Sequence, residues 1–149
     1  MVDHHFATPD AGKDGNEMLQ ITRQTEYALR GLMELAERDT GTPVRLKTLA
    51  VACDVSEAFL AKIFQMLSQH GVVKSHRGVK GGFTLGREKE QISLREVVEI
   101  CEGGIALNHC LRRADACTNS NDCKLSKVWV AAQKAMTSAL EGTTLKDLV

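Results

Sequence analysis

The feature that most constrains the fold is the segment 46–71, in which two short amphipathic stretches are separated by a turn. The first covers 46–52, with Leu46, Leu49 and Ala50 on one face, and the residues 53–55 form the turn. Ser56 is a good helix N-cap. The apolar residues behind it follow helical spacing up to Gly71, and they are Leu60, Ile63, Phe64 and Leu67. Two helices joined in this way predict a helix-turn-helix.

A β-hairpin is expected directly after this unit. Val72 and Val73 open one strand, and Phe83 and Leu85 alternate in another. The connection between them, SHRGVKGG at 75–82, combines three glycines with basic side chains. Glycine permits positive φ and close backbone approach. A basic, glycine-rich hairpin after a helix-turn-helix predicts a wing, although a plain turn would account for Gly81 and Gly82.

Helices are expected on both sides of this unit. Helical spacing covers 22–37, a capping box of Ser93 and Glu96 begins another helix that ends at 103–104, and a third runs over 124–141 before a turn at 144–148. The fold class is therefore mainly α with a small β-hairpin wing: a winged helix-turn-helix plus a long C-terminal helix. The expected units are a disordered tail at 1–18, a DNA-binding domain at 19–92, a sensor helix and cysteine loop at 93–123, and a dimerisation helix with its final turn at 124–149.

Charge is balanced over the whole chain but not along it. The 149 residues hold 19 basic and 19 acidic side chains, which excludes a generally basic nucleic-acid coat. Residues 56–89 alone hold six basic and two acidic side chains, so this stretch is the candidate for a local footprint on DNA. No apolar run is long enough to cross a bilayer, and the first residues lack the pattern of a secretory signal. We therefore expect a cytoplasmic protein.

The outward face of the second helix of the unit is the expected reading surface. If its apolar residues face the core, small and polar side chains face outward, as entry into a major groove requires. Lys62 could reach a phosphate or a guanine, and Gln65 could read adenine. In the hairpin, Arg77 suits a narrow minor groove and Lys80 a phosphate, whereas His76 is expected to be a surface residue. The predicted DNA contacts are Ser56, Glu57, Ala58, Lys62, Gln65, Arg77 and Lys80.

Three of the five cysteines lie close together in a polar segment. Cys110, Cys117 and Cys123 lack the short pairwise spacing of a structural zinc site, and their wider spacing suits a loop that wraps around an iron–sulfur cluster. Zinc and a thiol redox switch remain alternatives. Cys53 and Cys101 lie at positions expected to pack as small hydrophobic residues. The odd number of cysteines argues against a closed disulfide framework.

Longer stretches of the sequence resemble one known family. Residues 19–149 resemble the Rrf-two family of bacterial winged-helix regulators. The resemblance lies in LQITRQTEYALRGLMELA, in VSEAFLAKIFQMLSQHGVVKSHRGVKGGFTLG, in the three cysteines and in the following helix with Trp129. RGVKGGFTLG is the most specific part. Members of the Rrf-two family include the iron–sulfur regulator IscR and the nitric-oxide sensor NsrR. The resemblance implies a homodimeric transcription factor, usually a repressor, that binds a palindromic operator under the control of a cluster.

The fourth ligand separates the branches of this family. The resemblance implies a histidine three residues after the last cysteine in the IscR branch, and this position is Ser126 here. In the NsrR branch it implies a carboxylate from the partner's first helix, which matches Glu26. A two-iron branch would need histidine where Arg30 stands. The resemblance therefore favours NsrR and a [4Fe–4S] cluster, rather than [2Fe–2S], held by Cys110, Cys117, Cys123 and Glu26 of the partner subunit. His109 is a second candidate ligand.

These expectations describe a repressor whose operator affinity is controlled by a labile cluster that senses nitric oxide, redox state or iron supply. Loss of the cluster would change the spacing of two recognition helices, which must lie about 34–36 Å apart on a palindrome. The helix over 124–141, with Trp129 near its centre, would form the dimer contact. The same DNA-binding fold with a thiol switch or a zinc site is the alternative. The sequence holds no nucleophile–base pair or phosphate loop, so we expect no enzyme.

Overall fold

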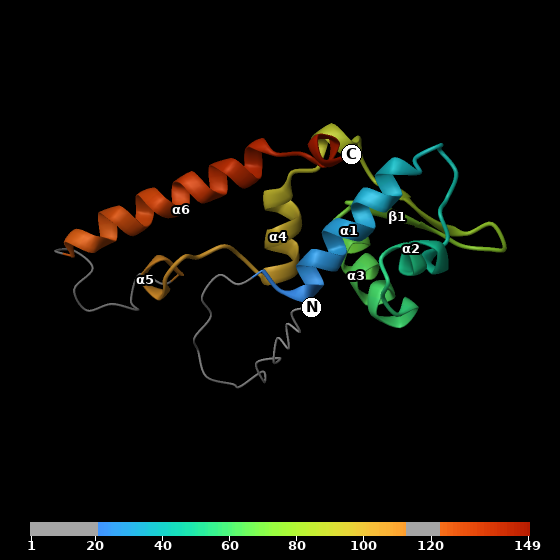
Figure 1. Ribbon diagram of the computed structural model, residues 1–149, viewed down its shortest axis with the longest axis horizontal. Coiled ribbons are helices and arrows are strands. Elements are labelled where there is room, and N and C mark those ends of the chain that lie inside the picture. The colour runs from blue at the N-terminus through green and yellow to red at the C-terminus, as the bar shows by residue number, and fades with distance from the viewer. Residues whose placement is uncertain (1–20, 113–122) are drawn as a thin grey trace, which may run out of the picture.

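The computed structural model describes residues 21–112 and 123–149, so the predicted tail and Cys117 lie outside the described residues. The chain is mainly helical with one two-stranded antiparallel sheet, as the sequence predicts (Figure 1). The elements in chain order are α1 (Arg23–Glu37), α2 (Leu46–Ala52), α3 (Glu57–Gln69), β1 (Val73–His76), β2 (Gly82–Leu85), η1 (Lys89–Gln91), α4 (Leu94–Glu102), α5 (His109–Arg112), α6 (Lys124–Gly142) and η2 (Leu145–Leu148).

The helix-turn-helix forms where caps and periodicity place it. The Ser56 hydroxyl accepts a hydrogen bond from the backbone N–H of Phe59 at 3.2 Å, which satisfies a free donor at the start of α3. The Thr22 hydroxyl caps α1 through the N–H of Thr25 in the same way. The four predicted core residues of α3 are all buried: Leu60, Ile63, Phe64 and Leu67.

One apolar core joins the helices to the wing. The Phe64 ring is fully buried and packs edge-on against Phe83 of β2, with ring centroids 5.0 Å apart. Gly31 of α1 lies against the same ring, and a β-carbon at this position would collide with it. Tyr27 and Phe59 make a second edge-on contact between α1 and α3. The hairpin is therefore packed on the helices that it follows.

The wing is held by a backbone bridge as well as by packing. Strands β1 and β2 pair from Val73 opposite Leu85 to His76 opposite Gly82. Val44, just before α2, bridges to Phe83 through two backbone hydrogen bonds of 2.8 Å. Gly82 has φ of 152°, and a β-carbon there would overlap the Val44 carbonyl. Gly82 therefore serves a close backbone approach and is more than a turn residue.

The core extends beyond the segment expected to form the DNA-binding domain. Ile92, Val97 of α4 and Leu145 of η2 are buried in the same cluster as α1 and α3. The backbone also closes this side, because the N–H of Leu145 donates to the carbonyl of Ile92 at 2.8 Å. Packing thus crosses the expected boundaries at 92 and 123. The functions assigned to the separate units, DNA binding, sensing and dimerisation, stay predictions.

The predicted capping box at the start of α4 forms only in part. The Ser93 hydroxyl accepts from the N–H of Glu96 at 3.2 Å, as predicted. The Glu96 carboxylate instead accepts a hydrogen bond from Arg87 at 2.6 Å. A charged guanidinium is a stronger donor than a backbone amide, and the fold brings Arg87 within reach. A complete box forms further along, between Thr144 and Asp147.

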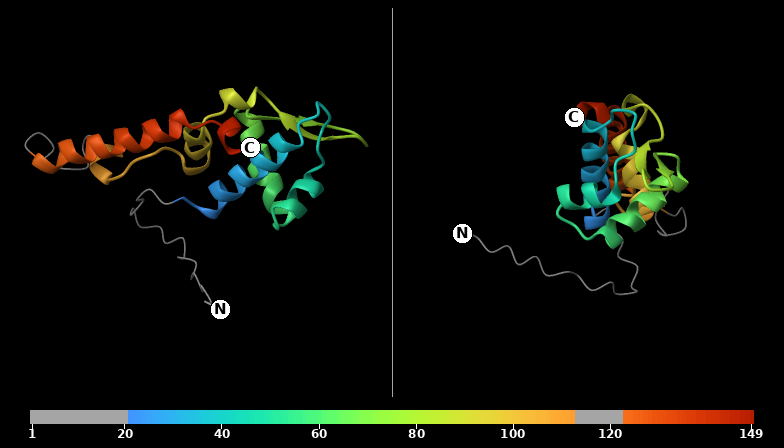
Figure 2. Two further views of the ribbon diagram at one scale, coloured as in Figure 1. Left: turned by 45° about the horizontal axis from the view of Figure 1, so that its top comes forward. Right: turned by 90° about the vertical axis from the view of Figure 1, so that its right-hand side faces the viewer.

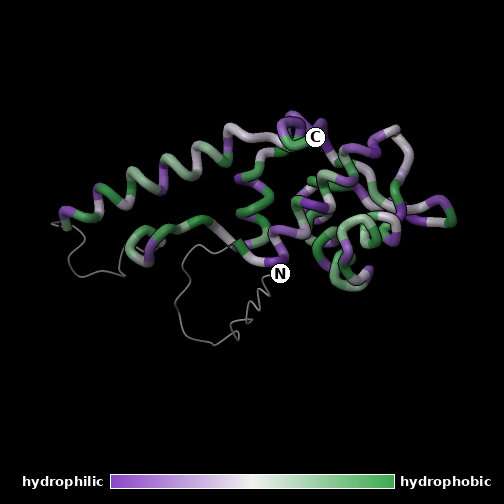
Figure 3. The backbone as a smooth tube through the Cα atoms, viewed as in Figure 1, coloured by the Kyte–Doolittle hydropathy of each residue, from purple (hydrophilic) through white to green (hydrophobic). Residues whose placement is uncertain are grey.

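Helix α6 extends away from the body formed by α1 to α4 and the hairpin, and together with α5 it forms an arm (Figures 1 and 2). It packs on α4 and α5, yet it contains no buried residue. Hydrophobic residues recur along its whole length (Figure 3), and the side chains of Leu125 and Val128 are 59% and 57% exposed. Much of its apolar surface is therefore left exposed by the described residues of the chain. Among the helices of the described residues, none is long and apolar enough to cross a membrane.

Candidate nucleic-acid interface and cysteine segment

The predicted reading surface of α3 is exposed. Burial of the opposite face of the helix turns the predicted contact residues outward, because helical periodicity separates the two sets. The side chains on this face include an acid, a base, an amide and a methyl group, so both donors and acceptors are available. They are Ser56, Glu57, Ala58, Lys62 and Gln65.

The wing extends its tip into solvent beside this helix. Val79, at the tip, is 91% exposed, and the predicted contact residues Arg77 and Lys80 on its two sides are also exposed. Gly78 has φ of 101°, which allows the chain to turn there. His76 is half-buried instead, and its Nε2 lies 2.9 Å from the Thr84 hydroxyl across the hairpin. Two exposed cations therefore flank the tip of the wing, and their contact with a minor groove stays a prediction.

A hollow between α2 and the wing contains two cations that the sequence prediction missed. The hollow measures about 350 Å³ and is lined by Arg45 and Lys47, by Glu57 at the start of α3, and by residues of the hairpin. The Arg45 guanidinium donates to the backbone carbonyl of Val79 at 3.2 Å. The signal in the sequence was the pair of cations in VRLK at the start of the short helix, outside the basic stretch of residues 56–89.

A polar cluster joins the start of α1 to the end of α4. The Glu102 carboxylate accepts hydrogen bonds from the backbone N–H and the hydroxyl of Thr22, both at 2.9 Å, and from the hydroxyl of Thr25. Thr25 is fully buried. Gln24 donates to the carbonyl of Cys101 at 3.4 Å. Glu102 carries no local signal in the sequence, because its partners lie about 80 residues away along the chain.

Two cysteines pack in the body, as expected. Cys53 is buried at the end of α2, and Cys101 packs against the core from α4. Burial raises the pKa of the Cys101 thiol to about 11, with the charge of Glu102 adding to the rise and a hydrogen bond to Thr25 opposing it. Burial, followed by the charge of Glu34, also raises the pKa of the Cys53 thiol. Both thiols are protonated at neutral pH, so neither has the thiolate form that binds metals.

The described cysteines of the polar segment lie away from this body, on the arm formed by α5 and α6. Cys110 is in α5 and Cys123 is the residue before α6; both are half-buried, and the two helices pack together. Cys117 lies outside the described residues. In the part of the chain that the structure describes, no three His, Cys, Asp or Glu side chains gather closely enough to hold a metal ion.

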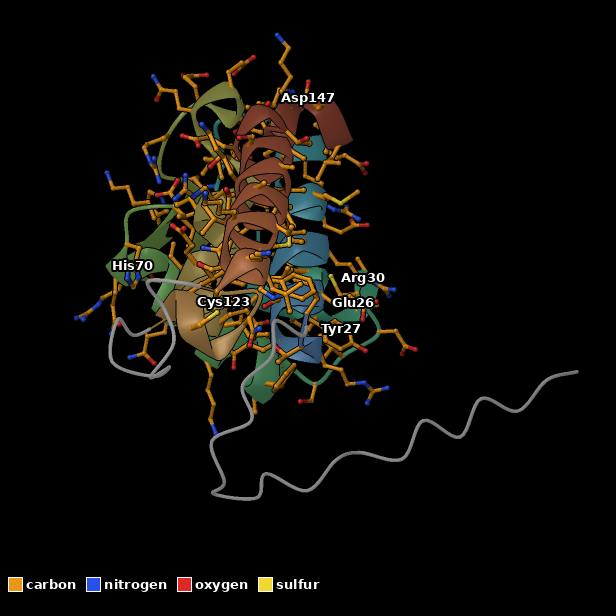
Figure 4. All side chains as sticks on the ribbon, turned by 90° about the vertical axis from the view of Figure 1, so that its left-hand side faces the viewer. Glu26, Tyr27, Arg30, His70, Cys123 and Asp147 are labelled. Atoms are coloured by element: carbon orange, nitrogen blue, oxygen red, sulfur yellow. The ribbon has the colours of Figure 1, made fainter. Side chains whose placement is uncertain are left out.

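Glu26 lies on a different part of the molecule. It is exposed on α1, where its carboxylate accepts from Arg30 at 2.5 Å. Figure 4 looks along the arm, with Cys123 at the near end and Glu26 and Arg30 behind it on α1, and Figure 1 shows the separation of α5 from α1 from the side. Among the described residues of one chain, Glu26 therefore does not join Cys110 or Cys123.

The recognition helix α3 and the wing together define a class of protein. A capped recognition helix with an exposed polar face, beside a basic wing, makes a winged helix-turn-helix that binds DNA. The Rrf2 (Rrf-two) family, which the sequence resembles, is described as "Iron-dependent Transcriptional regulator", and its pattern matches residues 21–149. The chain belongs to this family: it is a DNA-binding transcriptional regulator and not an enzyme.

Individual relatives differ in name at similar levels of identity. The chain is 33% identical over 132 residues to the regulator NsrR of Bacillus subtilis, covering 88% of this chain and 90% of that one. The solved structure of CymR, the global cysteine regulator of B. subtilis, matches with a TM-score of 0.74 and 32% identity, over 88% of this chain and 96% of that one. IscR of T. potens matches with a TM-score of 0.67 and 27% identity, over 87% and 85%.

Proposed function

We propose that this regulator is a cytoplasmic homodimeric repressor that binds a palindromic operator with an affinity set by a labile iron–sulfur cluster. The observation that carries the proposal is the contrast between two sets of cysteines. Cys53 is buried and Cys101 packs on the apolar core, and burial raises the pKa of both thiols. Cys110 and Cys123 instead lie at α5 and at the start of α6, on either side of the segment that includes Cys117.

The donors of this segment suit a cluster. Iron–sulfur clusters are held by cysteine thiolates, and three thiols in one short polar segment supply three ligands. Cys110, Cys117 and Cys123 would hold the cluster, and when bound it supplies a centre that nitric oxide, oxygen or iron loss can disrupt. The family's description as iron-dependent agrees with this assignment.

The fourth ligand is proposed to come from a second chain. Glu26 of the partner subunit is an exposed carboxylate on a rigid helix, and such an oxygen is a weaker ligand for iron than a thiolate. Glu26 is distant from the arm of its own chain, so a second copy is needed to bring the two together. A dimer formed through the uncovered apolar face of α6 would bury this face and supply that copy.

This arrangement would connect the state of the cysteine segment to the spacing of the reading surfaces. Glu26 lies on α1, which packs directly on α3. A ligand bond between the arm of one subunit and α1 of its partner would fix the distance between the two copies of α3. Palindromic half-sites require that distance to be about one helical turn, so breaking the bond changes DNA affinity.

A second candidate keeps the fold and the DNA binding but replaces the cluster with a thiol switch or a zinc site. The similarity to the global cysteine regulator CymR favours this candidate, because it is as close as the similarity to NsrR. The half-buried Cys110 and Cys123 are accessible enough to oxidise or to bind zinc. The two candidates differ in whether iron and inorganic sulfide accompany the protein.

Anaerobic purification tests the two candidates. The full chain is isolated without oxygen, and iron, acid-labile sulfide, zinc and the visible spectrum are measured before and after nitric oxide is added. We expect brown protein with iron and sulfide in equal amounts, and we expect nitric oxide to bleach it and to change operator affinity. Colourless protein that contains no sulfide and still binds its operator with full regulation would overturn the cluster and leave the thiol or zinc candidate.

The reading surface has its own test in Lys62→Ala. Lys62 is exposed on α3, so its loss should weaken DNA binding without affecting folding. If it contacts a phosphate, the slope of log affinity against log salt should fall by about 1. Fluorescence anisotropy with a DNA duplex at several salt concentrations measures this slope. An unchanged slope and affinity would remove Lys62 from the DNA contacts.

A further inference from the structure

We propose that one sugar–phosphate strand of the bound DNA lies across Arg45 and Lys47, in the hollow between α2 and the wing. The inference rests on the reading surface proposed above, with α3 in the major groove and the wing in the minor groove. It adds a phosphate site formed by α2, outside the basic stretch of residues 56–89. The ligand is the backbone of duplex DNA, recognised by charge and not by base sequence.

The path of the strand follows from the shape of DNA. The major and minor grooves of a duplex are separated by a single sugar–phosphate strand. An α3 in one groove and a wing tip in the next therefore leave this strand between them. The hollow of about 350 Å³ occupies this position, with Arg45, Lys47 and Glu57 on the helical side and Ser75, Gly78 and Val79 on the wing side. Figure 1 shows α2 beside the hairpin at the right-hand end of the molecule.

The charge around the hollow favours a phosphate on the α2 side. A second hollow of about 470 Å³ shares Arg45 and Lys47 and adds Arg38, and its described lining contains no acidic residue. Arg45 and Lys47 are the cations that line both hollows. Arg38 lines only the second, and it is already paired with Glu34 at 3.0 Å. Glu57 lines the first hollow on the α3 side, so repulsion directs a phosphate toward α2.

Arg45 is held in place for this role. Its carbonyl accepts from the N–H of Leu49 at 3.2 Å as the cap of α2, and the neighbouring Val44 is bridged to Phe83. Its guanidinium donates to the Val79 carbonyl at 3.2 Å, which uses one of its five N–H donors. The remaining donors can face a phosphate. Arg45 would thus hold the wing tip and the DNA strand with the same side chain.

The experiment measures the salt dependence of binding to a mixed-sequence DNA duplex by the full chain. Arg45→Ala and Lys47→Ala should each lower the slope of log affinity against log salt by about 1. When salt is raised from about 50 to 200 mM, binding by the unaltered chain weakens by some factor, and for each variant this factor should be about 3- to 4-fold smaller. Arg45→Lys and Lys47→Arg keep the charge and should keep most of the slope. Lys134→Ala, on the exposed side of α6, is the matched control and should change nothing.

The outcomes separate this inference from the reading surface on which it rests. If both alanine variants keep the full slope while Arg77→Ala lowers it, the DNA strand does not lie across α2 and the inference is overturned. If Arg77→Ala and Lys62→Ala also keep the slope, the proposed reading surface itself is wrong. Circular dichroism of each variant confirms that folding is unchanged, which is expected because the four side chains are exposed.

Discussion

Gly82 shows how one backbone position sets the place of the wing. Its positive φ and the carbonyl of Val44 beside it leave no room for a β-carbon. The two hydrogen bonds between Val44 and Phe83 depend on that close approach. They connect the hairpin to the start of α2, and so they also place Arg45 beside the wing tip. A single residue without a side chain thereby aligns two parts of the DNA-binding surface.

Gly82→Ala should therefore destabilise the protein by roughly 2 kcal/mol, through strain at positive φ and the collision with Val44. Urea unfolding followed by circular dichroism measures the change. Gly142→Ala is the control, because a β-carbon there meets nothing within 4 Å and α6 ends at that residue. The control should be neutral or slightly stabilising. Equal stability of the two variants would contradict the close approach.

The raised pKa of the Cys101 thiol predicts that the protein loses stability at high pH. Its folded pKa of about 11 lies above the ordinary value of 9.0, so the unfolded chain ionises first as pH rises. The stability contributed by the neutral thiol is complete below pH 9 and is lost between pH 9 and about 11. Because the side chain is only partly buried, we expect a loss on the order of 1–2 kcal/mol. The free energy of unfolding of Cys101→Ala, measured over the same range, should fall less than that of the unaltered chain; parallel curves would contradict the assignment.

At the scale of elements, α6 is a long helix that contains no buried residue, although it packs on α4 and α5. Its apolar residues follow helical spacing, yet the fold buries none of them. A second helix of the same kind is a partner of matching length and chemistry, and packing the two together would remove this apolar surface from water. The final turn η2 instead returns to the core through Leu145, which anchors the base of the arm. The arm is thus fixed at its base and exposed along its length.

Val128→Glu should shift the protein from dimer to monomer, because it places a charge on the exposed apolar face of α6. Sedimentation equilibrium at micromolar concentration measures the oligomeric state. Circular dichroism should show an unchanged helical body, since Val128 lies outside the core. Lys127→Ala, at a neighbouring exposed position, should remain dimeric. A dimer that persists in Val128→Glu would place the interface elsewhere.

At the scale of the whole molecule, α4 and α1 connect the cysteine segment to α3, which carries the predicted reading surface. Helix α4 leads into the cysteine segment, and its last residue, Glu102, holds Thr22 and Thr25 at the start of α1. Two glycines with positive φ follow directly, at 103–104, so the chain changes direction just after this junction. The proposed control of DNA binding would therefore have a path to α1 within one chain, in addition to the proposed ligand bond from Glu26 of the partner subunit.

Cys117→Ala tests the proposed control of the molecule as a whole. We expect the anaerobically purified variant to be colourless and to bind its operator with altered affinity, because one of three thiolate ligands is removed. Cys53→Ala is the matched control: its thiol packs in the body, so this variant should keep the colour. Visible absorption and anisotropy with operator DNA are the measurements. Retained cluster absorption in Cys117→Ala would refute its assignment as a ligand.

Local patterns predicted the elements with close boundaries. The helix expected at 46–52 is α2. The helix expected at 22–37 is α1 plus its N-cap Thr22, and the helix expected at 124–141 is α6 without its last residue. Caps and helical periodicity act over about four residues, so the chain carries them without reference to the rest of the fold. The exposed face of α3 followed from the same periodicity. The cysteine ligands stay a prediction, and Cys117 lies outside the described residues.

What the sequence by itself determined is therefore the set of elements, their order, and which face of α3 looks outward, because each depends on neighbours a few residues apart. Only the tertiary structure decided which distant residues meet: Glu102 with Thr25, Val44 with Phe83, and Arg45 with the wing tip. These contacts depend on how the elements pack, and that packing is set by the shared core of the whole chain. The hollow that holds Arg45 and Lys47 exists only after this packing is complete.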